Sequence, residues 1–193
     1  MSYTLTSTAR HESIVKRSRF IARAGPCCDE HSAQTFIDRV RDLTASHNCW
    51  AWKCGQQYRF DDDGEPGGTA GRPILQAIEG QDLDNVVVLV IRHFGGVKLG
   101  TGGLIRAYGG CAAECLRQAP TEPIIAMVRL ECRLPFEAIA LAHQLFERHG
   151  VSKLDERYVS DGVELTLELP RTSRDTLIAD LNNATSGKAG IRS

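Results

Sequence analysis

An uninterrupted apolar run, VVVLVI, occupies most of the segment 85–92, and a glycine-dense segment lies on either side of it. A β-branched run of this kind predicts a central strand that is buried on both faces. The flanking segments are DDDGEPGGTAGR at 61–72 and GGVKLGTGG at 95–103. Clusters of glycine indicate positive φ angles or the close approach of another group, since glycine is costly to order. Each cluster also precedes a predicted helix, whose free N–H groups favour anions, so we expect an anion- or polyanion-binding cleft between the loops.

Composition limits the class of protein. With 193 residues, of which 42% are hydrophobic and 24% charged, the chain suits one large or two small globular domains. Its net charge of −1 argues against a generally basic nucleic-acid coat protein and leaves room only for a local basic patch. The first residues lack the apolar core of a signal peptide, and no apolar run approaches the roughly 18 residues of a membrane span. We therefore expect a soluble, cytoplasmic protein with no membrane partner.

The cysteines favour neither disulfides nor a metal site. Their number, seven, is odd, and no Cys-x-x-Cys pair occurs. The best potential metal cluster combines His47, Cys49 and Cys54 and lacks a fourth ligand. We expect reduced thiols that serve as small apolar core residues, and neither a metal nor another cofactor.

The pattern up to residue 118 predicts strands followed by helices. Pro73 and Gly80 suit the first turn and the end of a short helix. Helical spacing is clearest at Phe36, Ile37, Val40 and Leu43. Strands are expected at 19–24, 49–55, 57–60 and 85–92, the second and third forming a hairpin, and helices at 31–46, 73–80 and 104–118.

A break at 119–123, APTEP, separates this region from a second one. Its β-α-β-β-α order is most of a ferredoxin-like split β-α-β domain. The closing strand would come from 187–193, which is short and weakly apolar, so we expect a poorly formed final edge. The fold class is thus α+β, with domains at 1–121 and 122–193. The elements expected in the second domain are strands at 124–134, 151–159 and 163–169 and helices at 136–149 and 173–184.

Two known phosphate-binding motifs are incomplete in the second glycine loop. Gly95–Gly100 fits the first six positions of a P-loop, but Thr101-Gly102 follows where Lys-Ser/Thr is required. Gly100-Thr101-Gly102 begins a dinucleotide-binding fingerprint, but Ile105 occupies the third glycine position. What remains is a strand leading through a glycine-rich turn into a helix N-terminus, either to hold phosphate or only to pack tightly.

Basic residues surround both loops. Lys98 and Arg106 belong to the second loop and the helix after it, and Arg72 ends the first loop. With the backbone N–H groups of the second loop, these side chains are expected to hold phosphates. The predicted phosphate- or nucleic-acid-binding residues are Arg72, Arg92, Gly95, Gly96, Lys98, Gly100, Gly102, Gly103, Arg106 and, as an extension of the basic track, Lys16, Arg17 and Arg19.

Arg106 shares one helical face with Gly110, Ala113 and Arg117. Small residues between two arginines allow a phosphate backbone to lie close to the helix. They equally allow the helix to pack on a neighbour, and for Gly110 and Ala113 packing is the simpler interpretation.

The acidic residues of the first loop have three interpretations. Asp62, Asp63 and Glu65 suit acid–base chemistry or Mg²⁺ binding, with His93 as a general base. They also suit a solvated turn, since Asp and Gly are common turn residues. In a third arrangement they pair with Arg72 or Arg92 and order the cleft. No nucleophile or orienting carboxylate accompanies His93, so catalysis stays undecided and the pattern leans towards a protein that is not an enzyme.

Several segments together form a distinctive signature: KRSRF at 16–20, NCWA at 48–51, DDGEPGGTAGRP at 62–73, RHFGGVKLGTGGL at 92–104 and AYGG at 107–110. They resemble the IMPACT family, in particular its bacterial YigZ-like members. The resemblance covers most of the N-terminal region, whereas the C-terminal region is similar only in element order and length. It implies an N-terminal domain like domain 2 of ribosomal protein S5 and a ferredoxin-like C-terminal domain like domain V of elongation factor G.

Both of these fold relatives work on RNA or the ribosome, so the resemblance implies a translation-associated regulator that binds RNA or the ribosome. The S5-like fold is also shared with small-molecule kinases, which keeps open a small enzyme acting on a nucleotide or phosphorylated substrate. A third hypothesis is a protein-interaction module whose C-terminal domain docks a protein partner through its sheet face or edge.

Overall fold

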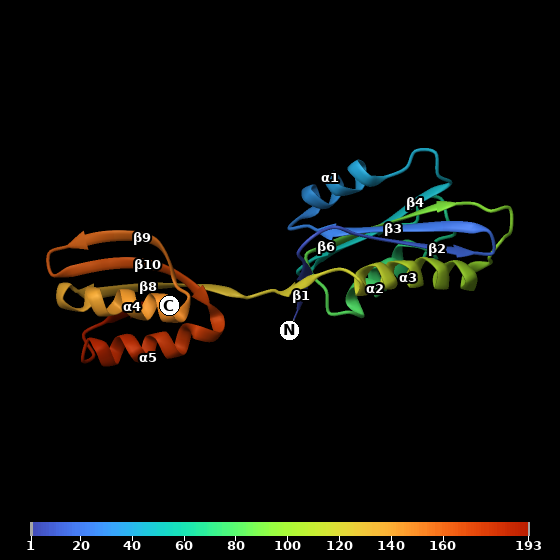
Figure 1. Cartoon of the computed structure of the whole chain (residues 1–193). Coiled ribbons are helices and arrows are strands. Elements are labelled where there is room, and N and C mark those ends of the chain that lie inside the picture. The colour runs from blue at the N-terminus through green and yellow to red at the C-terminus, as the bar shows by residue number, and fades with distance from the viewer. Residues whose placement is uncertain (1, 193) are drawn as a thin grey trace. The chain divides into compact units, whose positions relative to one another are not determined.

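The computed structural model describes residues 2–192 and divides after Ile124 into two compact units (Figure 1). Each unit combines helices with antiparallel sheets, which confirms the α+β class. The sequence predicted the division after residue 121. Residues 121–123 form β7 (Thr121–Pro123), which pairs with β1 (Tyr3–Leu5) and therefore belongs to the N-terminal unit.

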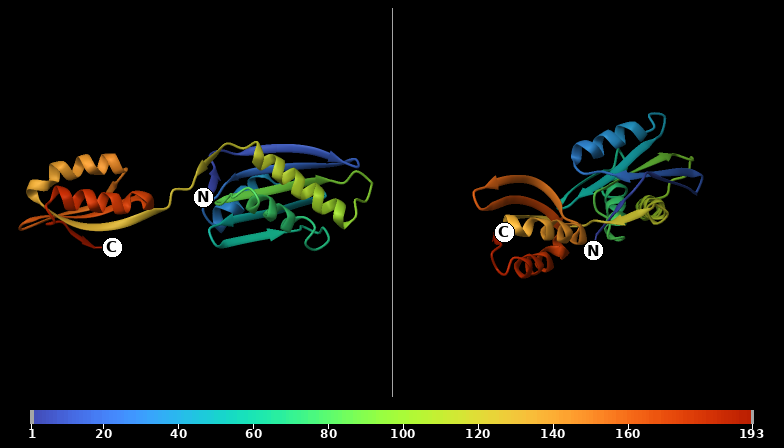
Figure 2. Two further views of the ribbon diagram at one scale, coloured as in Figure 1. Left: turned by 90° about the horizontal axis from the view of Figure 1, so that it is seen from below. Right: turned by 60° about the vertical axis from the view of Figure 1, so that its left-hand side comes forward.

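The N-terminal unit is built on a five-stranded antiparallel sheet in the order β2-β3-β6-β4-β5. Helix α1 lies on one face of this sheet, and α2 and α3 lie on the other (Figures 1 and 2). The strands are β2 (Ala9–Val15), β3 (Ser18–Pro26), β4 (His47–Cys54), β5 (Gln57–Asp61) and β6 (Val86–His93), and the helices are α1 (Glu30–Val40), α2 (Gly71–Glu79) and α3 (Thr101–Arg117).

Strand β6 occupies the centre of the sheet and is buried on both faces, as predicted. Val86, Val88 and Val90 pack in the core beneath α2 and α3. Val87, Leu89 and Ile91 alternate with them and pack in the core beneath α1. Helices cover both faces, which explains why residues 86–91 are all apolar and polar residues appear only at the end of the strand, at Arg92 and His93. The predicted hairpin is also confirmed, since β4 and β5 pair directly.

The sequence prediction missed β2, which pairs with β3 at the edge of the sheet. Its sequence, ARHESIV, carries polar residues at most positions, and the whole strand is partly or fully exposed. An edge strand needs little apolar surface, so its composition resembles that of a loop.

Helix α1 is shorter than predicted: it ends at Val40, and Leu43 lies outside it with 79% of its surface exposed. The apolar periodicity ran on to residue 43, but local polar contacts end the helix earlier. The Asp42 carboxylate accepts hydrogen bonds from the backbone N–H and the hydroxyl of Thr44. The Asn48 side chain in turn accepts the Asp42 N–H, which holds the chain in a turn.

The C-terminal unit has one four-stranded antiparallel sheet in the order β11-β8-β10-β9. Helices α4 and α5 cover one face and share its leucine-rich core, and the other face is open (Figure 2). As predicted, α4 ends at Gly150 in a left-handed conformation, and the closing strand is short. The elements are β8 (Met127–Pro135), α4 (Ile139–His149, after a 3₁₀ turn at Phe136–Ala138), β9 (Ser152–Val159), β10 (Gly162–Pro170), α5 (Arg174–Ala184) and β11 (Gly190–Arg192).

Most cysteines are core residues, as expected. Burial raises the pKa of the Cys115 thiol to about 12 and that of Cys132 to about 11, so both stay protonated at neutral pH. The buried free cysteines are Cys27, Cys49, Cys111, Cys115 and Cys132. Among residues 2–192, no helix combines the length and the apolar character that crossing a membrane requires.

Candidate functional site

One end of the N-terminal sheet brings together the segments that the sequence singled out. Strands β3 and β4 begin there, β6 ends there, and both glycine-rich loops lie there. Figures 1 and 2 show the turn between β2 and β3 beside the loop that joins β6 to α3. The first loop covers residues 62–70 and the second 94–100, because α2 begins at Gly71 and α3 at Thr101. Helix α3 thus starts earlier than predicted and includes Gly102 and Gly103 in its first turn.

The two loops are joined by a buried ion pair. Arg92 at the end of β6 donates from Nη1 to Oε1 of Glu65, over 2.5 Å, and both side chains are at most 5% exposed. The hydroxyl of Tyr108 on α3 donates to the same oxygen over 2.7 Å. Arg92 Nη2 donates to the Ser18 hydroxyl over 3.3 Å. The predicted pairing of the acidic loop with Arg92 is therefore confirmed. The sequence predicted an open cleft between the two loops, but at this point a buried ion pair joins them directly.

The first helix N-terminus is already occupied by a carboxylate of the chain itself. Asp62 accepts the backbone N–H groups of Gly68, Ala70 and Gly71 over 2.7–2.9 Å, at the start of α2. Burial disfavours the charged carboxylate, but these three hydrogen bonds outweigh it and hold the pKa of Asp62 below its ordinary value. Asp62 is thus a structural cap, and α2 has no vacant anion site at this end.

The other candidate catalytic residues, Asp63 and His93, contact different parts of the chain. One oxygen of Asp63 accepts the Asn48 N–H over 2.5 Å, and its carbonyl lies 2.7 Å from Nδ1 of His47. His93, the last residue of β6, lies 3.3 Å from the carboxylate of Asp42, which follows α1, and no contact joins it to the acidic loop among the described residues. Within residues 2–192, no three His, Cys, Asp or Glu side chains come together in the manner of a metal site. The acids therefore order this end of the sheet.

Helix α3 differs from α2, because its N-terminus is not capped by a side chain within the described chain. The preceding residue, Gly100, has φ 73°, a conformation that glycine adopts readily. Thr101 and Gly102 in its first turn are exposed, and the first N–H groups of a helix have no partner within the helix itself. Arg106 extends back over this turn, with its guanidinium 3.5 Å from where a Cβ of Gly102 would be.

The second glycine loop is seated directly on the turn between β2 and β3. A Cβ at Gly95 would lie 2.0 Å from the carbonyl oxygen of Arg17 and 2.5 Å from the nitrogen of Ser18, so only glycine fits. The Ser18 hydroxyl also accepts the Gly95 N–H over 3.2 Å. This contact places the basic turn residues, Lys16 and Arg17, next to the loop that carries Lys98.

We name the four basic residues of this region the basic rim: Lys16, Arg17, Lys98 and Arg106. All four are exposed, and within residues 2–192 none has a carboxylate at ion-pairing distance. Their charges therefore remain available to a ligand.

The other predicted basic residues are placed differently. Arg92 is the buried partner of Glu65 and is not available to phosphate. Arg19 is exposed but lies 2.6 Å from Glu12, and this pairing lowers the pKa of Glu12 to about 2. Arg72 is exposed in the first turn of α2. On α3, Gly110 is exposed with nothing within 4 Å of a Cβ, so the packing interpretation was wrong for this residue.

The turn of the basic rim is strained. Lys16 and Arg17 form a two-residue hairpin loop with φ angles of 44° and 69°, where Asn-Gly is strongly preferred. We expect Lys16→Asn combined with Arg17→Gly to stabilise the N-terminal unit by about 1 kcal/mol, because the turn would no longer need a disfavoured conformation. Urea denaturation followed by tryptophan fluorescence measures this change. An unchanged midpoint would show that the turn carries no strain.

Sequence reasoning assigned no role to Tyr108, Asn48 or Asp42, although Asn48 and Tyr108 lie within the signature segments. Tyr108 had a usable signal: it is a bulky residue among small ones, and it follows Leu104 by four positions on the same helical face. Asn48 and Asp42 gave no such signal, because their hydrogen bonds connect segments whose proximity depends on the turn after α1.

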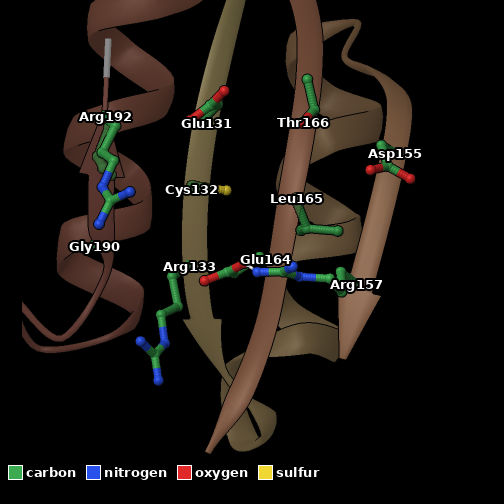
Figure 3. A pocket seen from close by; sticks show the side chains of 11 residues that line it. Glu131, Cys132, Arg133, Asp155, Arg157, Glu164, Leu165, Thr166, Gly190 and Arg192 are labelled. Atoms are coloured by element: carbon green, nitrogen blue, oxygen red, sulfur yellow. Dashed lines mark hydrogen bonds and ion pairs between the residues drawn. The ribbon is translucent and has the colours of Figure 1, made fainter. Parts of the chain in front are cut away.

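The open sheet face of the C-terminal unit has a shallow depression of about 580 Å³ (Figure 3). Its lining carries both charges, and Arg157 reaches across to Glu164 over 2.7 Å. Arg133 neighbours Glu164 on the adjacent strand, and Arg192 is aligned with Glu131. Charges that alternate in this way do not favour a polyanion, unlike those of the basic rim.

Comparison with known proteins agrees with this division of the chain. Residues 16–116 match the family model described as "Impact N-terminal domain". Residues 132–188 match the model described as "Domain of unknown function (DUF1949)". The "IMPACT family member in pol 5'region" of Thermus thermophilus is 49% identical over 81% of this chain and 87% of its own length. The "IMPACT family member YigZ" of Escherichia coli is 42% identical over 56% of each chain. A crystal structure described as that of a hypothetical protein matches with TM-score 0.73 and 29% identity, over 100% of this chain and 96% of its own. The chain therefore belongs to the IMPACT family and resembles its bacterial YigZ-like members.

Proposed function

We propose that this protein is a translation-associated regulator that binds RNA, free or on the ribosome, through the basic rim. One observation carries the proposal: the close seating of Gly95 on Arg17 and Ser18, which joins the basic turn to the loop before α3. Membership of the IMPACT family supports a translation-related role in general terms. The basic rim and the open start of α3 are the features of this chain that suit phosphate groups.

The finer fold assignments are part of the proposal. We infer that the N-terminal unit is related to domain 2 of ribosomal protein S5. We also infer that the C-terminal unit is a ferredoxin-like domain related to domain V of elongation factor G. The β-α-β-β-α-β order of the second unit and its sheet order, β11-β8-β10-β9, support this second assignment.

The charges of the N-terminal unit explain how a protein with a net charge of −1 can bind a polyanion. Its acidic residues at this end of the sheet are engaged: Glu65 with Arg92, Asp62 with the start of α2, and Asp63 with Asn48. None of the basic-rim side chains has an ion-pair partner among the described residues, so their charges are available to a ligand. Binding of this kind depends on the release of counterions and weakens steeply with salt.

Replacing Lys98 and Arg106 together with Ala is expected to weaken binding of any RNA sequence and to reduce the salt dependence of binding. If each side chain contacts one phosphate, the slope of log K against log salt concentration falls by about 2. Fluorescence anisotropy with a labelled RNA of mixed sequence, repeated over a salt series, measures both quantities.

The matched control removes two exposed arginines from the C-terminal unit, Arg148→Ala with Arg171→Ala, which changes the net charge equally. We expect this control to bind as the unaltered protein does. Unchanged affinity and slope in the folded Lys98→Ala/Arg106→Ala protein would overturn the assignment of the basic rim.

The open face of the C-terminal unit supports a second candidate function, docking of a protein partner. The helices cover only the opposite face, and the depression with its alternating charges is open to solvent. Paired charges of both signs suit a polar protein surface better than a nucleic acid.

The candidate site of the N-terminal unit gives less support to an enzyme. Among the described residues it provides no nucleophile beside a base, and its acids are held by other groups.

A further inference from the structure

Phe94 is a large aromatic side chain exposed beside the basic rim. It follows β6 directly and precedes Gly95, the residue seated on the basic turn. Of its surface, 49% is exposed. The backbone at Phe94 is anchored, because its N–H donates to the Ser46 hydroxyl over 3.1 Å. A single exposed aromatic side chain is ordinary by itself, so the surroundings of this ring decide whether it has a binding role.

The cationic side chain of Arg92 packs against the ring of Phe94. The guanidinium carbon of Arg92 lies 5.4 Å from the centre of this ring and 5.5 Å from the centre of the Phe20 ring. Arg92 itself is held by Glu65 and by Ser18, and it is buried. Arg92 therefore contacts both rings through a guanidinium that cannot rotate freely, which limits the movement of Phe94.

The chemistry of the surroundings restricts what can cover the exposed part of the ring. Lys98 lies in the same loop as Gly95, and Arg17 lies in the turn that Gly95 contacts. Neither side chain has a carboxylate at ion-pairing distance in the described chain. Gly96 has φ 82°, and a Cβ there would meet nothing within 4 Å, so the backbone beside the ring is open to solvent. A ligand with a flat apolar surface and a neighbouring negative charge suits these surroundings. An unpaired nucleobase with its phosphate has both properties.

We propose that Phe94 is a stacking platform for one unpaired base, which makes single-stranded RNA the ligand of the basic rim. The inference rests on the proposed function and adds the class of nucleic acid. In a duplex, each base is covered by its neighbours and cannot reach the ring. Phosphate contacts from Lys98 and Arg17 position the strand, and stacking on Phe94 selects unpaired segments.

Substitution of Phe94 in the full chain tests this proposal. Phe94→Leu keeps an apolar side chain but removes the aromatic face, and Phe94→Trp keeps an aromatic face. The probes are a labelled single-stranded RNA of about ten nucleotides, a duplex of the same sequence, and a single-stranded oligonucleotide with abasic sites in place of bases. The same single-stranded RNA with one 2-aminopurine reports stacking directly through fluorescence quenching.

We expect Phe94→Leu to weaken binding of the single-stranded RNA about tenfold, to abolish the quenching of 2-aminopurine, and to leave binding of the abasic strand unchanged. Phe94→Trp should retain both affinity and quenching. The matched control is Leu43→Ala, an exposed apolar residue on the loop after α1, which should bind as the unaltered protein does.

Two outcomes would overturn the inference, and they are distinguishable. If Phe94→Leu binds single-stranded RNA as tightly as the unaltered protein while Lys98→Ala/Arg106→Ala binds weakly, the stacking role is wrong and the proposed function remains. If the unaltered protein binds none of the three probes, both the inference and the proposed function are wrong.

Discussion

Replacing Glu65 with Gln is expected to destabilise the N-terminal unit by roughly 3–5 kcal/mol, since it leaves the charge of Arg92 buried without a counter-charge. Both side chains of this pair are at most 5% exposed, so solvent cannot compensate the loss. One of the guanidinium nitrogens, Nε of Arg92, already has no hydrogen-bond partner among the described residues. The remaining contacts of Arg92 with Ser18 and the two phenylalanine rings are too weak to replace a carboxylate.

Urea denaturation with tryptophan fluorescence measures this change in the relevant unit. The chain has two tryptophans, Trp50 and Trp52, and both lie in β4, so the signal reports the N-terminal unit alone. The control is Glu79→Gln, an exposed residue at the end of α2, which should shift the free energy of unfolding by no more than about 0.5 kcal/mol. A loss below about 1 kcal/mol for Glu65→Gln would contradict a buried ion pair.

A double substitution separates the charge from the packing. Glu65→Leu combined with Arg92→Met removes both charges, so no uncompensated charge stays buried. We expect this protein to be more stable than Glu65→Gln. Recovery should be partial, because the Tyr108 hydroxyl would lose its acceptor at Glu65.

Gly95→Ala is expected to cost the N-terminal unit about 3 kcal/mol, which is at the upper end of the range for overpacked sites. The reason is space, since a Cβ would lie 2.0 Å from the carbonyl oxygen of Arg17, a backbone atom that cannot move without shifting the hairpin. Either the second glycine loop or the basic turn must be displaced. The substitution should therefore also weaken RNA binding, because it separates Lys16 and Arg17 from Lys98.

Gly67→Ala is the control for this prediction. Gly67 lies in the other glycine-rich loop, and a Cβ at this position would meet nothing within 4 Å. We expect Gly67→Ala to leave the urea midpoint and the RNA affinity nearly unchanged. If Gly95→Ala behaved in the same way, the two loops would not be in the close contact that the basic rim requires.

Elements with strong local signals were predicted correctly. The run at β6 is apolar at successive positions and rich in β-branched residues, which favours a strand covered on both faces, and the structure places it at the sheet centre. The end of α4 at Gly150 and the hairpin of β4 and β5 follow from glycine and turn chemistry within a few residues. Prediction failed where the apolar pattern was misleading. The helical spacing runs past the end of α1, which local polar contacts stop, and the edge strand β2 is mostly polar.

At the candidate site, the roles of individual residues were harder to predict than the helices and strands. The residue types of the glycine loops, the basic residues and the acidic cluster are all visible in the printed sequence, and the structure brings these segments to one end of the sheet. Their roles depend on pairing between distant segments. Arg92 and Arg106 look alike in sequence, yet one is buried against Glu65 and the other is exposed over the start of α3.

From the sequence alone came the α+β class, the order of most elements and the residues from which a binding site can be built, because these depend on periodicity and turn chemistry over short distances. The tertiary structure decided which charges neutralise one another and which stay free. Asp62 caps α2 and Glu65 pairs with Arg92, which leaves the basic rim and Phe94 exposed. Such choices depend on desolvation and on contacts between residues tens of positions apart, and no local pattern in the chain encodes them.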